Sequence, residues 1–464
     1  MISKATAIKV LNEALATGAD FAEIYLEEDE ATSLSMDNGK VEAINDTLTR
    51  GAGIRLLKGF QSVYGYTNTI TLNGLLKLAK ELRASFHEER MLTVSSITKV
   101  RDRKKHRPEI EYATYPRENI IAMMKKASDT ALNYDEKIVR CQVSFACNYK
   151  TVEIFNSDGK QFNDVHSRGR ISIVATAKNE TALETFHNAP GAQKGMEFFL
   201  NEVNIEKIAA DTAQGALTML DARECPSGKM TVIIGNGFGG VIFHEACGHP
   251  LEASSVAKGL SVFFGKKGEK IASELVSACD DGTIEGGWGS GNVDDEGNPT
   301  ERTILIKDGI LTNYLIDNFN GRRMGMKGNG ACRRESYKYE PTSRMSNTFI
   351  MNGTSTPEEI IAATKFGLYA KSMGGGSVNP ATGEFNFAVN EGYIVEDGKI
   401  SYPVKGATLI GSGKDVLLNI DMVGNDLLRA QGMCGAASGS IPADVGEPTI
   451  RVQNITVGGR GGTL

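Results

Sequence analysis

Three side chains suited to metal chemistry lie close together in the sequence. They are His244, Glu245 and His249, in the stretch HEACGH. Zinc in catalytic sites binds imidazole nitrogens and keeps one position open for water, while a neighbouring glutamate can accept a proton from that water. The residue types therefore predict a hydrolytic zinc centre with His244 and His249 as ligands and Glu245 as general base. The alternative is a buried helix whose histidines are incidental.

The two histidines are five positions apart, one more than in the common HExxH protease motif. Five steps of about 100° on a regular α-helix would point the two imidazoles roughly 140° apart. A π-bulge, in which a hydrogen bond closes over five residues, would bring them back to one face. Gly248 and Pro250 favour a local break in the helix. The spacing thus predicts a π-bulge or helix break within Cys247 to Pro250.

The motif is expected to stand on a strand, a glycine turn and a helix. Met230 to Ile234 suits a buried strand, Gly235 to Gly240 suits a turn, and Val241 begins a helical pattern. The turn also fits G-x-G-x-x-G, the dinucleotide-binding pattern. That pattern needs an acidic residue at the end of a second strand about 20 residues on. Here Pro250 and a polar stretch follow instead, so a dinucleotide site is the weaker interpretation.

A third protein ligand is not fixed by the local sequence. Cys247 lies three residues after His244 and would share its face on a regular helix. A ligand held between two others on one short segment reaches tetrahedral geometry with difficulty, and a buried thiol beneath the helix is the commoner role. Glu252 could bind the metal if the chain turns back after Pro250. The more distant cysteines also stay open.

Several sequence blocks resemble the TldD/PmbA metalloproteases and occur in that family's order. They cover most of residues 230–464, whereas the N-terminal half is similar mainly in its pattern of elements. In the TldD branch two histidines and a distant cysteine hold zinc and the glutamate is the base, while the PmbA branch lacks the motif. The resemblance thus implies one zinc ion per chain on His244, His249 and Cys434, with Glu245 as base. The blocks are HEACGHPLEA at 244–253, GNGACRRESYKYEPTSRMSNTF at 328–349, GGGSVNPATGEF at 374–385, PVKGATLIGSG at 403–413, MVGND at 422–426 and GMCG at 432–435.

The resemblance also implies a substrate and a partner. Members of the family cleave unfolded or extended peptides and work as dimers, commonly of one TldD chain and one PmbA (TldE) chain. We therefore expect a zinc-dependent endopeptidase that pairs with a PmbA-like subunit or with a second copy of itself. The rival is a non-enzymatic peptide-binding or regulatory subunit with a structural zinc, which would be closed by four protein ligands.

The block at 328–349 is rich in cations and phenols. Fixed arginine and tyrosine side chains in a glycine-flanked stretch suit a peptide backbone or a carboxylate. We expect Arg334, Tyr337 and Arg344 to bind the substrate. The alternative is that they are surface residues of a β-rich loop.

Composition limits the class of protein. The chain has 464 residues, of which 41% are hydrophobic and 23% charged, as is ordinary for a soluble globular protein of two or more domains. A net charge of −6 argues against a nucleic-acid-binding protein. The seven cysteines form no C-x-x-C pair, and no leader-like or membrane-spanning apolar segment is evident. These features predict a reduced, cytoplasmic protein with neither membrane nor nucleic acid as partner.

The remaining pattern predicts an α+β fold. Helices are expected near 7–15, 72–82, 117–131 and 205–220, and the first and third precede hairpin-linked strands, so that a helix-then-meander order occurs twice. A boundary near 222–228 would divide an N-terminal domain of helices packed on antiparallel sheet (1–224) from a largely antiparallel, β-rich catalytic domain with the metal-site helix and the distal cysteine (225–464). The basic run at 99–107 is expected to be a solvated loop or edge strand, or else to contact a partner or an acidic peptide.

Overall fold

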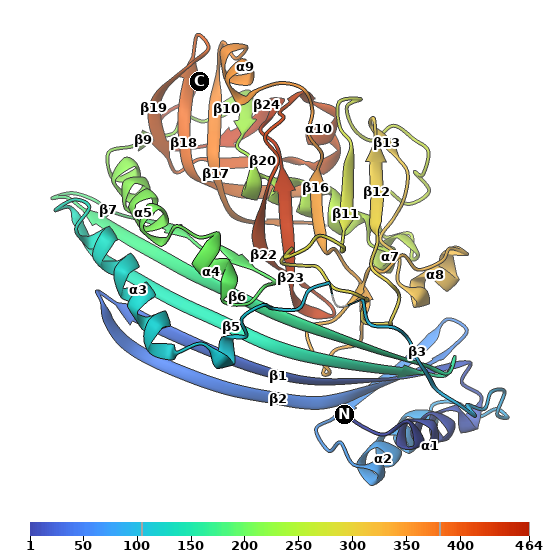
Figure 1. The fold of residues 1–464 in the computed structure, drawn as a ribbon. Helices are drawn as coiled ribbons and strands as arrows, with labels where there is room; N and C mark the ends of the chain where they lie inside the picture. Colours follow the sequence, from blue (N-terminus) through green and yellow to red (C-terminus); the bar gives the residue numbers. More distant parts are fainter. Residues whose placement is uncertain (104, 380–381, 464) are drawn as a thin grey trace.

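In the computed structural model, which describes residues 1–103, 105–379 and 382–463, the first half of the chain forms one long curved sheet (Figure 1). Its main path runs in the order β3-β2-β1-β5-β6-β4, and β7 and β8 pair with β6. The hairpins β1–β2 and β5–β6 are antiparallel along their whole length. The strands are β1 Phe21–Asp37, β2 Lys40–Lys58, β3 Gln61–Thr67, β4 Thr98–Lys99, β5 Ile138–Asn156, β6 Lys160–Lys178, β7 Leu183–Asn188 and β8 Gly191–Ala192.

Two pairs of helices cover the two ends of this sheet (Figure 1). Helix α1 packs with α2 at one end, and α3 packs with α5 at the other. Each pair closes its own hydrophobic cluster, because each helix carries an apolar stripe at helical spacing. The helices are α1 Lys4–Ala14, α2 Leu72–Arg83, α3 Arg117–Leu132, α4 Glu197–Asn201 and α5 Ile205–Leu220, with short 3₁₀ turns at Leu15–Thr17 and Tyr112–Thr114. The four expected helices are confirmed within a few residues.

The strands of the first meander are longer than the sequence pattern indicates. The pattern predicts separate strands before and after residues 27–30 and 46–49, but β1 and β2 run through both positions. No glycine or proline stands there to turn the chain, and these polar residues pair across the hairpin, Glu27 opposite Gly51 and Glu30 opposite Leu48. The sequence Asp37-Asn38-Gly39 also predicts a hairpin turn. This turn is confirmed, since Asn38 and Gly39 both have positive φ, as a tight two-residue hairpin turn requires.

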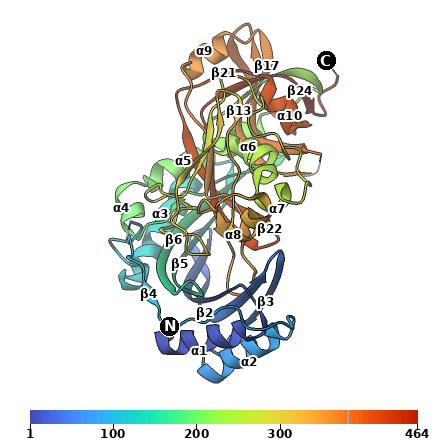
Figure 2. The ribbon, with the colours of Figure 1, turned by 90° about the vertical axis from the view of Figure 1, so that its right-hand side faces the viewer.

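The second half of the chain stands above the N-terminal sheet in the view of Figure 2. It builds two mixed sheets around the largest hydrophobic cluster. One sheet has the main order β17-β10-β24-β20-β18-β19-β9 with β21 beside β24, and the other has the order β13-β12-β11-β16-β23-β22. Most pairs are antiparallel, although β10–β17, β16–β23 and β9–β19 are parallel. The predicted α+β class is confirmed.

The second half of the chain contains strands β9 to β24 and a series of short helices. The strands are β9 Arg223–Glu224, β10 Gly228–Ile234, β11 Ala278–Asp281, β12 Arg302–Lys307, β13 Ile310–Leu311, β14 Cys332–Arg333, β15 Thr342–Ser343, β16 Asn347–Ile350, β17 Phe366–Val378, β18 Glu384–Glu396, β19 Lys399–Lys405, β20 Thr408–Ser412, β21 Ile420–Val423, β22 Leu428–Ala436, β23 Gly439–Glu447 and β24 Ile450–Gly458. The helices are η3 Gly237–Gly240, α6 Val241–Phe243, η4 His244–Gly248, η5 His249–Leu251, α7 Ala253–Val256, α8 Asn318–Met324, α9 Pro357–Ala362 and α10 Gly413–Leu418. None of the described helices has the length and apolar character needed to cross a bilayer.

The basic run at 99–107 starts at the edge of the N-terminal sheet. Strand β4 pairs with β6, and beyond it Arg101 and Arg103 are exposed in a stretch without regular structure. Arg107 forms an ion pair with Asp102. This agrees with the predicted solvated loop and edge strand, while Lys104 lies outside the described residues, as do residues 380 and 381 of the block at 374–385.

Candidate metal centre

The motif stands on the predicted strand, turn and helix. Strand β10 leads into the 3₁₀ turn η3, which leads into α6 and the π-helix η4. A Cβ added at Gly240 would overlap the backbone of Gly446 in β23, and one at Gly235 would overlap the carbonyl of Lys371 in β17. These glycines therefore allow protein backbones to approach each other. Their close packing leaves no support for the dinucleotide interpretation.

The helix deforms at the histidines, as the five-residue spacing requires. Residues 244–248 form a π-helix, and the backbone N–H of His249 donates to the carbonyl of His244, five positions earlier. The two imidazole rings consequently meet edge to face, with their centroids 5.2 Å apart and their planes at 88°. The predicted π-bulge is confirmed, although it begins at His244, three residues before the predicted interval. The helix continues as a 3₁₀ turn containing Pro250, which ends it.

Cys434 joins the two histidines from a strand far along the chain. It lies on β22, and its Sγ is 3.2 Å from Nε2 of His244 and 3.3 Å from Nε2 of His249. One potential ligand atom from each residue lies within 4.8 Å of the other two. His244 and Cys434 are buried and His249 is nearly so. Two imidazole nitrogens and a thiol that converge in this way are a donor set suited to zinc.

The charge state of the thiol also suits a metal ligand. Burial alone would raise the pKa of Cys434, but the charge of His244 and hydrogen bonds with both imidazoles lower it to about 4. Burial alone would lower the pKa of His249, but the carboxylate of Glu252 and the contact with Cys434 raise it well above its usual range. The cluster therefore stabilises the thiolate, which is the form of cysteine that binds metals.

Glu252 lies on the far side of His249. Its Oε1 is 3.1 Å from Nδ1 of His249 and 3.6 Å from Nε of Arg344. A carboxylate on Nδ1 holds the proton there and leaves Nε2 free to bind a metal. The structure thus gives Glu252 an orienting position and does not bring it into the group of converging ligand atoms.

Glu245 is the acidic side chain beside this cluster on the motif itself. Its Oε2 is 3.8 Å from Nε2 of His249, and 23% of its side chain is exposed. Cys247, the other local alternative as ligand, is fully buried in the hydrophobic core and is not among the converging residues. The arrangement therefore has three converging ligand residues, with a partly exposed carboxylate next to one of them.

The three residues expected to bind substrate have partners inside the protein instead. Arg344 is 0% exposed and donates to the hydroxyl of Ser438 and to the carbonyls of Gly439 and Cys434. Because its Nε also faces Glu252, it ties the segments of His249 and Cys434 together. A surface role is therefore not supported for Arg344, and the sequence pattern missed this internal function.

Arg334 and Tyr337 are likewise held at the junction of the two halves of the chain. Arg334 is 4% exposed, pairs with Glu23 of β1 at 2.9 Å and stacks over Tyr25. Tyr337 is 6% exposed and packs on Gly51 of β2, where a Cβ would overlap its ring. These packing contacts hold Arg334 and Tyr337 in place, and the expectation that they contact substrate stays a prediction.

Sequence models of one family match nearly the whole chain. The PmbA/TldA metallopeptidase domain 1 matches residues 22–86, the central domain of that family matches residues 111–220, and its C-terminal domain matches residues 227–459. The third match contains all of the converging ligand residues.

Full-length relatives and solved structures agree with these matches. A protein named metalloprotease TldD homolog from Buchnera aphidicola is 33% identical over 97% of this chain and 95% of its own, and one from Haemophilus influenzae is 34% identical over 95% and 93%. The fold resembles that of TldE from Thermococcus kodakarensis (TM-score 0.78, 17% identity, 98% of this chain and 99% of that one). It also resembles a putative modulator of DNA gyrase from Thermotoga maritima (TM-score 0.79, 21% identity, 98% and 99%).

Proposed function

Because the chain belongs to the family of PmbA/TldD metallopeptidases, we propose that it is a zinc-dependent endopeptidase with one zinc ion held by His244, His249 and Cys434. The observation that carries this proposal is the convergence of the two Nε2 atoms and the Cys434 sulfur on one small volume. Three protein ligands leave a tetrahedral ion one position for water or substrate, as in catalytic zinc sites. A closed structural site would need a fourth protein ligand.

Bound zinc would supply Lewis acidity, polarising the scissile carbonyl and favouring ionisation of the attacking water. The side chains of Glu245, Glu252 and Arg344 would carry out proton transfer and hold the proposed ligands in position. Glu245, half-buried beside His249, would accept the proton from the attacking water and pass it to the leaving amine. Glu252 would keep the imidazole of His249 in the correct orientation and tautomer. Arg344 would hold the backbone of Cys434 in place through its carbonyl.

Extended or unfolded peptides are the proposed substrates. Strand β22, which carries Cys434, lies at the edge of its sheet. Recognition of an extended peptide by strand addition requires such an edge. The carbonyls of Gly432 and Cys434 accept hydrogen bonds from Trp288 and Arg344, which fix this strand relative to the metal centre. A peptide that adds to this edge must therefore pair with other groups of β22 or share these two acceptors. An unfolded chain could place its own backbone along the centre, whereas a folded domain could not.

Metal removal tests the proposal directly. We expect purified protein to contain one zinc ion per chain, to hydrolyse a quenched fluorescent peptide, and to lose hydrolysis when a chelator removes the ion. Zinc added back should restore the rate, because the ligands are neutral or anionic donors that rebind it. Full zinc content without hydrolysis of any unfolded peptide, alone or with a PmbA-like chain, would support the rival regulatory subunit instead.

We also propose that the protein works in the cytoplasm as a dimer, either with a PmbA (TldE)-like subunit or with itself. All seven cysteines are free thiols, as suits a reducing compartment. Among the described strands, β1 alone pairs with residues 40–50 of β2, so the other edge of this segment is open, with Val41, Ile44 and Leu48 exposed. Such an edge is a surface that a partner would cover.

Sedimentation velocity should therefore show a species of two chains, alone or with the PmbA-like chain of the same organism. A charged substitution at the exposed edge, Ile44→Lys, should shift the distribution toward monomer, whereas Leu260→Lys, at an exposed residue of a distant loop, should not. A monomer under all of these conditions would contradict the dimer.

A further inference from the structure

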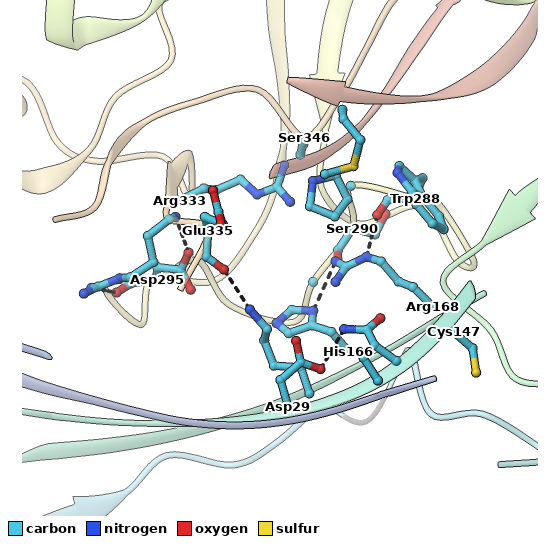
Figure 3. Close-up of a pocket in the computed structure, with 18 of the residues that line it drawn as sticks. Asp29, Cys147, His166, Arg168, Trp288, Ser290, Asp295, Arg333, Glu335 and Ser346 are labelled. Atoms are coloured by element: carbon cyan, nitrogen blue, oxygen red, sulfur yellow. Dashed lines mark hydrogen bonds between the residues drawn. The ribbon is translucent and has the colours of Figure 1, made fainter. Parts of the chain in front are cut away.

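A cavity of about 490 Å³ lies between the N-terminal sheet and the second half of the chain (Figure 3). Strands β1, β2, β5 and β6 form its floor, and the segments at 288–295 and 330–335 and the β22–β23 hairpin form its roof. The cavity is not lined by His244, His249 or Cys434, but two of its lining residues belong to segments that build the metal centre. Met433 in its wall precedes Cys434, and Ser346 in its wall follows Met345, which packs on Gly248 of the π-helix.

Two arginines point into this cavity without a carboxylate partner (Figure 3). Arg168 of β6 donates to the carbonyls of Trp288 and Ser290, and Arg333 of β14 donates to the carbonyl of Met345. Within residues 1–103, 105–379 and 382–463 neither guanidinium forms an ion pair. Burial and the charge of Arg333 lower the pKa of Arg168 to about 9, and burial also lowers the pKa of Arg333. The charge of Arg333 thus lies close enough to destabilise the charged form of Arg168.

The acidic groups that line the same cavity are engaged elsewhere. Asp29 accepts from Asn148, and Asp295 accepts from the backbone N–H of Arg334. Asp294 accepts from the amide of Asn298, and burial raises its pKa well above the usual range, so that its charge is suppressed. Glu335 accepts from the backbone of Ser440. Asp29 and Asp295 stabilise the charge of Arg168, and Asp295 also stabilises that of Arg333, but neither carboxylate lies within ion-pair distance of these guanidinium groups. The nearby Lys150 pairs with Glu27.

We propose that this cavity binds a carboxylate of the peptide substrate, from an acidic side chain or from the C-terminus, between Arg168 and Arg333. Guanidinium groups bind carboxylates through paired hydrogen bonds, and such charge-assisted bonds are strong when water is excluded. The volume accommodates a short peptide segment, since ligand cavities commonly span about 300–1,000 Å³. Trp288 and Met433 add apolar surface beside the charged groups.

The inference deepens the proposed peptidase and rests on it for the nature of the ligand. Met433 and Cys434 are consecutive on β22 and therefore face opposite sides of that strand. A peptide laid along the edge of β22 would project alternate side chains to the two sides, one toward the metal centre and the next toward the cavity. The enzyme would then prefer peptides with a carboxylate at a fixed distance from the scissile bond. That preference is a property of the cavity and can be measured without turnover.

Binding of labelled peptides to the zinc-loaded Glu245→Ala protein tests the cavity without cleavage. The probes are one peptide with a single glutamate and a free C-terminus, the same peptide with glutamine, the same with a C-terminal amide, and the doubly neutral form. We expect about a 10-fold or larger loss of affinity for whichever change removes the bound carboxylate, since a charge-assisted hydrogen bond is lost. The probe whose affinity falls shows whether the bound carboxylate comes from the glutamate side chain or from the C-terminus.

Arginine variants then locate the effect. Arg333→Met should abolish the preference and leave the affinity for the doubly neutral peptide unchanged. Arg168→Lys keeps the positive charge but loses the planar guanidinium group, so it should reduce the preference for the carboxylate-bearing peptide. The matched control Arg460→Met, at an exposed arginine outside the cavity, should leave it intact.

Equal affinity of the Glu245→Ala protein for all four peptides, or a preference that survives when Arg333→Met is added to it, would overturn the carboxylate site. Failure of the peptidase proposal shows itself separately, as absence of hydrolysis in the original protein at full zinc content. Zinc content and circular dichroism of each variant exclude loss of fold as the cause of an altered preference.

Discussion

Replacing Glu245 by alanine is expected to lower peptide hydrolysis by about 10²- to 10⁴-fold, the usual contribution of a general base, while zinc stays at one ion per chain. The carboxylate is partly exposed, and its nearest polar partner among the proposed ligands is His249 at 3.8 Å. Removing it therefore leaves the three converging ligand residues and the buried core in place. The measurement is the initial rate on one peptide, with zinc determined on the same sample.

Two further variants sharpen this test. Glu245→Gln keeps the shape of the side chain but cannot accept a proton, so it should lose activity to a similar degree. Glu274→Ala removes an exposed glutamate of a loop away from the centre and should keep the full rate. Unchanged turnover in Glu245→Ala would refute the enzyme mechanism, and loss of zinc in that variant would instead make Glu245 a ligand.

The second large effect is expected at Cys434. Cys434→Ser should lose both zinc and activity, because the sulfur is the only one of the converging ligand atoms that comes from β22, and a hydroxyl is a far poorer ligand than a thiolate. Cys247→Ser is the matched control within the motif, since Cys247 is buried beneath the helix and outside the cluster. It should keep its zinc even where the polar hydroxyl costs some stability.

Glu252→Gln provides an intermediate case. It removes the negative charge next to Nδ1 of His249 but no ligand atom, so zinc affinity should fall by about 10- to 100-fold, as for other outer hydrogen-bond partners. The measurement is zinc content after dialysis against a graded chelator series. Full zinc and full turnover in Cys434→Ser, with loss in Cys247→Ser or Glu252→Gln, would overturn the ligand assignment.

Local sequence predicted the parts of this site that local geometry controls. The β-branched run, the glycines and the helical start gave the strand, turn and helix in the correct order. The five-residue spacing predicted the π-helix because two ligands of one ion must share a face. Even the role of Glu252 has a local signal, since it follows His249 by three residues.

Long-range pairing could not be predicted in the same way. Nothing in the residues around Cys434 distinguishes it from the other cysteines, and it was selected through the resemblance of its GMCG block. Arg168 lies in an alternating strand without a motif, so its position opposite Arg333 follows only from the fold. For Arg344 the sequence pattern was misleading. A charged residue in a polar block suggests a surface position, whereas contacts with β22 and β23 bury this side chain.

The separation of the ligands along the chain has a consequence for biosynthesis. Strand β10, which leads to the histidines, pairs with β24 at residues 450–458, and Cys434 is made 185 residues after His249. A nascent chain emerges from the N-terminus onward, so neither the proposed third ligand nor this support for the histidine segment exists until nearly all of these residues have been translated. A ribosome that stalls earlier therefore releases an inactive product. Because of this topology, the metal centre can be completed only after the N-terminal sheet has had time to fold.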